Sequence, residues 1–396
     1  MTSVIVAGAR TPMGRYLGAL SSVPATALGG HAIAAALARS GVAASEVDQV
    51  VLGHVVQAGA GQAPARQAAA LGGIGVDVPA TTLNTVCLSG IDAVMQADRL
   101  IRLGEADVVV AGGMESMSRA PHLVPGARSG VGYGPATLAD ALELDGLWDA
   151  RTGQSMGALT DAANAAGERI ARADQDAFAV RSHARAAAAR DAGLLAEEIA
   201  PLEVTARRAT TLVEHDEGIR ADTSAEALAG LRPAFGADGT ITAATSSPLS
   251  DGAAALLVMR RELAEERGLD WIAEIGAAGQ VAGPDSTLQH QPSRAIEAAL
   301  RREGATVADL DLVEINEAFA VVGLASIADL GLDPDRVNVN GGAIALGHPL
   351  GMSGARLVLA LALSLRRTGG RLGVAALCGG SGQGSALLLR GRGAHA

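Results

Sequence analysis

The feature of this sequence that most constrains its fold is an internal repeat. An alanine-rich helical pattern that stops at Gly41 recurs in a pattern that stops at Gly304, and the strand pattern at 47–50 recurs at 310–313. A loop that opens a helix at Cys87 has its counterpart at His348, in the same order and at nearly the same offset. We therefore expect a tandem duplication of one unit, with a site where equivalent loops of the two halves meet.

Strand and helix patterns alternate in both halves, which predicts an α/β fold with a parallel or mixed sheet. One helix is expected at 32–40, and one strand at 106–111 that ends in Gly112-Gly113. Residues 119–250 have no counterpart in the second half, and an insertion of this kind usually carries binding contacts.

The predicted domains follow from the position of the insertion. They are an N-terminal half at 1–118, completed by about 251–270, an inserted loop domain at 119–250, and a C-terminal half at 271–396.

Composition limits the classes of function. A net charge of −11 argues against a nucleic-acid-binding or anionic-membrane-binding surface, and 49% hydrophobic residues suffice for a large core. Two cysteines do not make a disulfide framework, so a reducing compartment is expected. The N-terminus shows no signal-peptide pattern, and the longest apolar run, 357–365, is too short to cross a bilayer. These features predict a cytoplasmic protein without a membrane partner.

Cys87 is the first candidate for chemistry. It stands between an apolar approach and the small pair Ser89-Gly90, ahead of a helical pattern at 91–103. A thiol at a helix N-terminus would lie near unpaired N–H groups, which favour the thiolate. The alternative is a buried cysteine that acts as a small hydrophobe. The other thiol, Cys378, comes before a glycine-rich loop, and we expect neither thiol to lie inside a helix or strand.

Three polar groups in the second half are predicted to converge on Cys87. They are Asn316, directly after a strand pattern, His348 in a glycine-rich loop, and Cys378. Such a group supports covalent acyl transfer: one cysteine attacks a thioester, the histidine takes its proton, and backbone N–H groups hold the oxyanion. A second cysteine can exchange a proton with a carbon acid.

Other interpretations of these residues are weaker. His348 could be a structural loop histidine. A zinc site is disfavoured because the two cysteines are far apart and no Cys-x-x-Cys or His-x-x-x-His pair exists, so no metal is expected. The glycine-rich turns lack the Gly-x-Gly-x-x-Gly spacing of a dinucleotide site.

The sequence resembles the thiolase family, in its acetyl-CoA acetyltransferase branch, over essentially its whole length. The motifs that carry the resemblance are ARTP at 9–12, GQAPARQ at 61–67, the Cys87 loop, GGMESMS at 112–118, DGAA at 251–254, NEAF at 316–319, GHP at 347–349 and CGG at 378–380. The resemblance implies two duplicated α/β halves in five αβαβα layers, the thiolase fold, with an inserted loop domain that binds CoA.

The resemblance also implies catalytic roles. Cys87 would be the nucleophile that becomes acylated, and His348 would activate it. Cys378 would be the acid/base at the α-carbon. Asn316, through a water molecule, would join His348 in one oxyanion hole, and the backbone N–H groups of Cys87 and Gly380 would form the second.

For CoA, the resemblance implies that Arg220 contacts the nucleotide and Ser247 the pantetheine. Two departures affect the substrate. The family's His-Met-Gly reads Ser-Met-Gly at 155–157, which removes an imidazole facing the pantetheine. The family's Met-Gly-x-Gly-Pro reads Leu-Gln-His-Gln-Pro at 288–292, which alters a wall of the acyl pocket.

The implied reaction is reversible: two acetyl-CoA give acetoacetyl-CoA and CoA, or a 3-ketoacyl-CoA is cleaved by CoA. CoA is a substrate, and no cofactor is implied. The alternatives are a degradative 3-ketoacyl-CoA thiolase for longer or dicarboxylic chains and, against the presence of both thiols and the histidine, a non-catalytic acyl-CoA or lipid carrier. The family resemblance suggests a homo-oligomer, a dimer or a tetramer, with tetramer contacts at 121–135.

Overall fold

Each half of the duplicated sequence folds into a mixed β-sheet in the computed structural model, which describes residues 1–167, 169–206 and 209–395. The sheet of the first half has the spatial order β4 (Ala80–Leu83), β3 (Gln49–Gly53), β5 (Val108–Ser116), β12 (Ser250–Arg260) and β1 (Ser3–Arg10). The sheet of the second half has the order β14 (Leu312–Ile315), β15 (Leu372–Gly379), β16 (Gln383–Gly391) and β13 (Ala273–Ala282). The duplication is therefore present in the fold.

The strand directions repeat as well. β3 is parallel to β5, as β14 is to β15, and the last two strands of each sheet are antiparallel. The two sheets join at one edge, where Val4 and Ile5 of β1 pair with Glu274 and Ala273 of β13. The short strand β2 (Gly14–Arg15) adds to β12.

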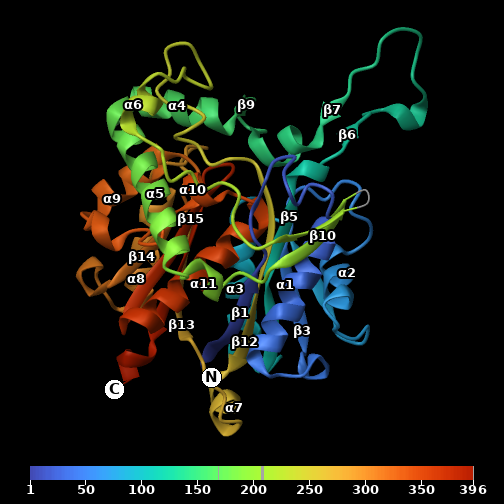
Figure 1. Ribbon diagram of the computed structural model, residues 1–396, viewed down its shortest axis with the longest axis vertical. Helices are drawn as coiled ribbons and strands as arrows, with labels where there is room; N and C mark the ends of the chain where they lie inside the picture. The colour runs from blue at the N-terminus through green and yellow to red at the C-terminus, as the bar shows by residue number, and fades with distance from the viewer. Residues whose placement is uncertain (168, 207–208, 396) are drawn as a thin grey trace.

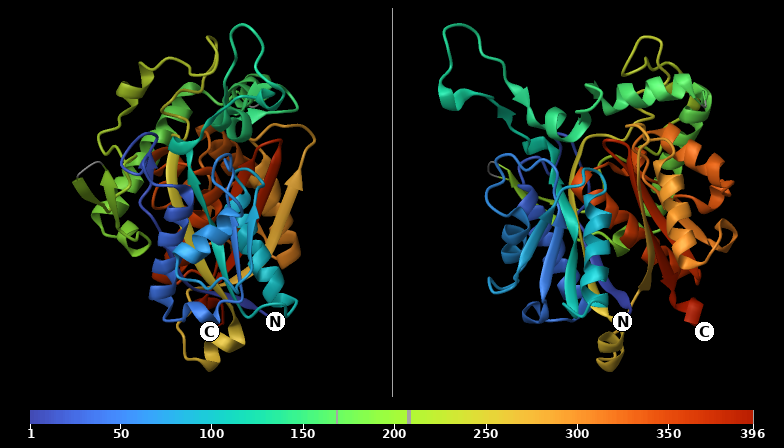
Figure 2. Two further views of the ribbon diagram at one scale, coloured as in Figure 1. Left: turned by 90° about the vertical axis from the view of Figure 1, so that its right-hand side faces the viewer. Right: turned by 180° about the vertical axis from the view of Figure 1, so that it is seen from behind.

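Helices form the other three layers, so the predicted five-layer thiolase fold is confirmed. α1 (Ala25–Ser40) and α2 (Pro64–Leu71) cover the outer face of the first sheet, and α8 (Gln291–Glu303) with α9 (Ala320–Leu330) covers that of the second. α3 (Ser89–Arg102) and α11 (Leu350–Thr368) lie between the sheets, as Figure 2 shows from behind. The equivalent helices α1 and α8 both end at a glycine in the left-handed region, Gly41 and Gly304, where a Cβ would be strained.

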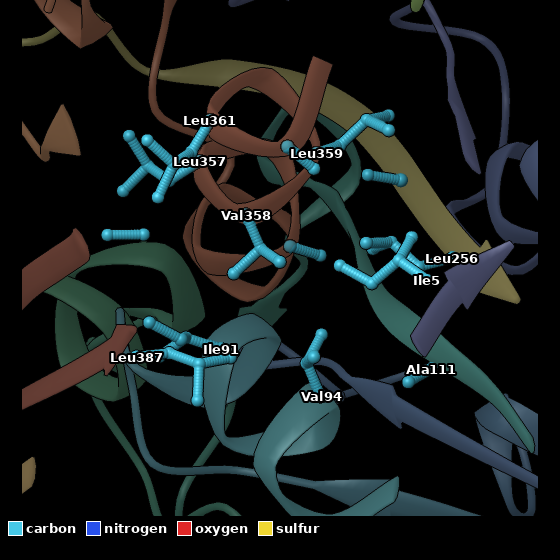
Figure 3. Packing of buried hydrophobic residues seen from close by; sticks show 14 of the residues in the cluster. Ile5, Ile91, Val94, Ala111, Leu256, Leu357, Val358, Leu359, Leu361 and Leu387 are labelled. Carbon is cyan, nitrogen blue, oxygen red and sulfur yellow. The ribbon is translucent and has the colours of Figure 1, made fainter. Parts of the chain in front are cut away.

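The central layer is held by apolar side chains that face both sheets. Ile91 and Val94 of α3 pack with Val358 of α11 between Ile5 of β1 and Leu387 of β16 (Figure 3). Full burial of each such aliphatic side chain contributes about 1.5–3 kcal/mol, so this layer fixes the two helices relative to both sheets.

The N-terminal ends of α3 and α11 touch backbone to backbone. A Cβ placed on Gly90 would lie 2.7 Å from the backbone nitrogen of Ala355, and one on Gly354 would overlap the backbone nitrogen of Ile91. The loops that precede these helices carry Cys87 and His348, so the close approach brings the two loops together.

Two sequence predictions were wrong at glycines. β5 does not end at Gly112-Gly113 but continues to Ser116. Glycine is required at these two positions inside the strand, because a side chain on Gly112 would overlap the Ala254 carbonyl of the neighbouring strand and one on Gly113 would overlap the Gly351 carbonyl of α11. The helix expected from residue 32 begins at Ala25. Gly29 and Gly30 lie inside this helix, packed against Met114 and Leu71, so in both places glycine allows close packing instead of ending the element.

Part of the insertion, including α4 (Met156–Ala166) and α6 (Ala225–Ala229), lies over the ends of the sheets that carry the loops of Cys87 and His348, at the top of Figure 1. α5 (Arg172–Asp191) packs against α9 and the short helix α10 (Ala343–Leu346). A long arm that carries β6 (His122–Leu123) and β7 (Ala139–Asp140) projects from the body. The remaining elements are α7 (Arg261–Glu266), β8 (Trp148–Asp149), β9 (Gln154–Ser155), β10 (Leu202–Ala206) and β11 (Ala209–Val213). Within the described part of the chain, no helix has both the length and the apolar character needed to cross a membrane.

Candidate active site

A pocket of about 780 Å³ opens where the two halves meet the insertion. The predicted residues that line it are Cys87, Arg220, Ser247, His348, Cys378 and Gly380. Asn316 lies behind the wall, fully buried and in contact with His348. The structure therefore brings together the residues that the repeat and the resemblance singled out.

Cys87 lies in a sharp turn between β4 and α3. Val86, just before it, has a φ of 53°, a left-handed conformation that costs a β-branched residue on the order of 1–3 kcal/mol. The Ser89 hydroxyl holds this turn: it accepts from the Thr85 N–H at 2.9 Å and donates to the Val86 carbonyl at 2.6 Å. The strain and these bonds fix the direction of the Cys87 side chain at the pocket wall.

The Cys87 thiol is neutral at rest, contrary to the prediction that the helix terminus favours the thiolate. Burial among apolar side chains raises its pKa to about 12, and the charge of Glu115 adds to the rise. The backbone N–H groups of Cys87 and Gly380 face the sulfur and lower the pKa, but they do not offset the burial. The thiol therefore needs a base at the moment of attack.

His348 is held from both ring nitrogens. Its Nδ1 is 2.6 Å from the Ser353 hydroxyl and its Nε2 is 3.3 Å from the Asn316 amide nitrogen. Because an amide nitrogen only donates, Nε2 accepts, and the ring proton lies on Nδ1. Burial, with a contribution from Arg356, lowers the pKa of His348 to about 3, so the imidazole is a neutral base with its lone pair on Nε2.

Cys378 lies inside β15, one residue from its end, and not in the loop after it as we expected. It is 1% exposed, and burial raises its pKa above the ordinary value of a thiol. The neighbouring Cys87 sulfur raises that pKa further.

Several pocket residues were missed by the sequence reasoning. The chain has only seven aromatic residues, and three of them, Tyr16, Phe235 and Phe319, line this pocket. The rings of Phe235 and Phe319 meet edge to face at 5.9 Å. The composition held a signal for these residues. In a chain with so few aromatic rings, each ring is a candidate for the ligand site, because large exposed rings such as Phe235 are found where a ligand covers them.

The two departures from the family pattern have local explanations. The Ser155 hydroxyl accepts from the Ala158 N–H at 3.2 Å and so caps α4. In the altered segment only Leu288 lines the pocket, since the Gln289 side chain turns away to the Thr160 carbonyl and His290 pairs with Asp329. The change at the acyl wall is thus limited to Leu288.

Arg220 and Ser247 both lie on the pocket wall, but Arg220 is exposed and Ser247 is partly buried. The backbone N–H of Arg220 donates to Nδ1 of the buried His183 at 3.2 Å. Ser247 donates from both its backbone and its hydroxyl to the Ala318 carbonyl. The structure places both residues on the pocket that holds Cys87.

Comparisons with known proteins agree with this arrangement. A family model described as the thiolase N-terminal domain matches residues 3–262, and one described as the thiolase C-terminal domain matches residues 269–391. A probable acetyl-CoA acetyltransferase of Mycobacterium tuberculosis is 59% identical over 98% of this chain and 99% of its own length. A probable acetyl-CoA acetyltransferase of Mycolicibacterium smegmatis is 58% identical over 98% of this chain and all of its own length. An acetyl-CoA acetyltransferase of Pseudomonas aeruginosa is 46% identical over 98% of both chains. The chain belongs to the thiolase family.

Proposed function

We propose that this protein is an acetyl-CoA C-acetyltransferase, which condenses two acetyl-CoA to acetoacetyl-CoA and CoA and catalyses the reverse cleavage. The observation that carries the proposal is the meeting of Cys87, His348 and Cys378, from both halves, on one pocket. The names of the relatives, at 45–59% identity over nearly the whole chain, support the same reaction.

In the first step the Cys87 sulfur attacks the thioester carbonyl of acetyl-CoA. His348 takes the thiol proton at Nε2, which the hydrogen bonds to Ser353 and Asn316 leave unprotonated. The N–H groups of Cys87 and Gly380, which face the sulfur, are the donors available to the oxyanion. The carbon–sulfur bond to CoA then breaks, and His348 returns the proton to the departing CoA sulfur.

In the second step Cys378, as the thiolate, removes a proton from the methyl group of a second acetyl-CoA. The enolate carbon attacks the acyl carbonyl on Cys87, and the Cys87 sulfur leaves as a thiolate. The proton gained by Cys378 then passes to Cys87 and restores the starting state. In this starting state Cys378 is a thiolate and Cys87 is protonated. Because the pKa of each thiol is raised, this state is disfavoured in the empty pocket relative to two protonated thiols, and the reaction should accelerate as the pH rises.

Asn316 fits the role that the resemblance implies for it, next to a water molecule. Its backbone N–H is anchored to the Ala376 carbonyl at 2.9 Å, and its amide nitrogen reaches His348. Its buried Oδ1 has no hydrogen-bond partner within the described residues, although buried polar atoms nearly always have one. A water bound there would satisfy Oδ1 and stand beside Nε2 of His348 as a donor to the enolate oxygen.

The test is CoA-dependent cleavage of acetoacetyl-CoA, run beside 3-ketohexanoyl-CoA and 3-ketooctanoyl-CoA, with Cys87→Ala as the control. We expect acetoacetyl-CoA to be preferred and the variant to be inactive. Equal or faster cleavage of the longer chains would assign the protein to the degradative thiolases. Activity that survives in Cys87→Ala would refute the acyl-cysteine mechanism.

We further propose a cytoplasmic homo-oligomer, a dimer or a tetramer, without a cofactor. The arm supports oligomer formation, because its residues Val124, Val131 and Tyr133 are exposed on a segment that projects from the body. Light scattering of the protein with and without residues 121–135 would show whether the arm joins subunits.

A further inference from the structure

Glu115 is a buried acid next to the active site that the mechanism above does not use. It lies on β5 and is 0% exposed. Its carboxylate accepts hydrogen bonds from three backbone N–H groups, those of Val55 at 3.1 Å, Val56 at 3.2 Å and Gly351 at 3.0 Å. Two of these donors belong to the first half and one to the second, so a single carboxylate joins both.

On the side of the second half, Glu115 holds the start of α11. Gly351 is in the first turn of that helix, three residues after His348, and its N–H has no partner within the helix. A carboxylate at this position satisfies the N–H group and suits the positive end of the helix dipole. Glu115 thereby fixes the helix start from which the His348 loop extends.

On the side of the first half, Glu115 is connected to the turn of Cys87 through Val55 and Asn84. The Val55 carbonyl accepts from the Asn84 amide nitrogen at 3.3 Å, and the Asn84 Oδ1 accepts from the Val86 N–H at 3.0 Å. Val55 and Val56 also share an apolar cluster with Cys87. The charge of Glu115 also contributes to the raised pKa of the Cys87 thiol.

We propose that Glu115 is a positioning residue that sets the placement of Cys87 relative to His348, by joining the loop after β3 to the first turn of α11. This inference rests on the proposed function, because it concerns the step in which His348 takes the Cys87 proton. Glu115 does not line the pocket, so it should affect the rate of the chemical step and leave substrate binding unchanged.

Protonation of Glu115 should weaken the junction, since a protonated oxygen cannot accept from the same N–H group. Burial raises the pKa of this carboxyl to about 7, and the charge of Asp251 on β12 adds to the rise. The other titratable groups that face it are His54, 3.4 Å away with a pKa lowered to about 4 by burial, and the neutral Cys87 thiol. In the wild-type enzyme a distinct step in kcat near pH 7, on top of the steady rise with pH that the two thiols produce, should therefore follow Glu115.

The test is Glu115→Gln, which keeps the size of the side chain but replaces one acceptor oxygen by a donor that faces an N–H group. Glu274→Gln is the matched control, because Glu274 is also a buried acid in a strand but pairs with Arg261 and Arg390, away from the pocket. The readouts are kcat, KM for acetoacetyl-CoA, the pH profile of kcat and the melting temperature.

In Glu115→Gln we expect kcat to fall on the order of 10²-fold, the effect of a misplacement of about 1 Å, with KM within twofold. The steady rise of kcat with pH should remain, but the step near pH 7 should be absent. A kcat within threefold of the wild-type value would overturn the proposal, as would a loss of kcat that Glu274→Gln matches at the same melting temperature. If Glu115→Gln does not fold, the exposed residue Asn84 provides the second test: Asn84→Ala should lower kcat about tenfold at unchanged KM, and an unchanged kcat refutes the junction. A wild-type enzyme that does not cleave acetoacetyl-CoA would instead refute the proposed function.

Discussion

Removal of the Ser353 hydroxyl should reduce catalysis by changing which nitrogen of His348 carries the proton. Ser353 is 2% exposed, and its hydroxyl lies 2.6 Å from Nδ1 of His348 and 2.9 Å from the Pro349 carbonyl. In Ser353→Ala the Nδ1–H group loses its acceptor in a site that excludes solvent. The tautomer that serves as a base at Nε2 then loses the bond that favours it.

The magnitude follows from the cost of a buried donor without a partner, about 1–3 kcal/mol. If that penalty falls on the active tautomer, kcat drops about 5- to 150-fold. The Pro349 carbonyl still accepts from the N–H groups of Met352 and Ser353, so the start of α11 should keep its structure. We therefore expect KM for acetoacetyl-CoA to change by less than twofold.

The assay is steady-state cleavage of acetoacetyl-CoA by wild type, Ser353→Ala and Ser364→Ala. Ser364 is a matched control on the same helix, 1% exposed and bonded to Asn340 away from the pocket. Nitrogen-15 NMR of labelled histidine reports the position of the ring proton directly, on Nδ1 in the wild type and shifted toward Nε2 in the variant. The reasoning is refuted if Ser353→Ala keeps kcat within twofold of Ser364→Ala, or if the proton stays on Nδ1 while kcat falls.

Two further predictions concern the thiol and the helix crossing. Because burial raises the pKa of Cys87 to about 12, alkylation of the free enzyme by iodoacetamide should accelerate about tenfold per pH unit from 7 to 10, with no plateau; a plateau below pH 9 would show that the thiolate is already stabilised at rest. Gly354→Ala should unfold or inactivate the protein, because its Cβ would overlap the backbone nitrogen of Ile91, whereas Gly369→Ala, at the left-handed C-terminus of α11 and with open space around it, should lose only about 1 kcal/mol of unfolding free energy. Chemical denaturation compares the two variants, and equal losses would contradict the importance of the crossing.

The internal repeat predicted those features of the fold that follow from the sequence pattern within one half, such as where equivalent helices begin and end. Gly41 and Gly304 end equivalent helices as their spacing indicated, and the loops of Cys87 and His348 open equivalent helices. Once the halves are known to be equivalent, convergence of their loops follows from symmetry. That is why the pocket could be predicted from Cys87, His348 and Cys378 without any knowledge of their distances.

What could not be predicted depends on contacts between segments far apart in the chain. Gly112 and Gly113 have the composition of a turn, yet they lie inside β5, because the strand and helix that press against them come from residues 250–260 and 350–368. The pKa of Cys87 was predicted with the wrong sign for a similar reason. The local effect of the N–H groups was visible in the sequence, but the burial that outweighs it comes from the whole pocket wall.

The duplication explains how two different catalytic groups came to share one geometry. Each central helix carries a Ser-Gly pair near its N-terminus, Ser89-Gly90 at the start of α3 and Ser353-Gly354 in the first turns of α11, and the two glycines form the contact between the helices. Ser89 follows Cys87 by two residues and bonds the backbone of its own turn. Ser353 follows His348 by five residues, and the longer connection lets the same hydroxyl reach the imidazole instead. The fold thus supplies two equivalent turns that face each other across a glycine contact. A change in loop length then makes one serine a support for the nucleophile's backbone and the other a partner of the base.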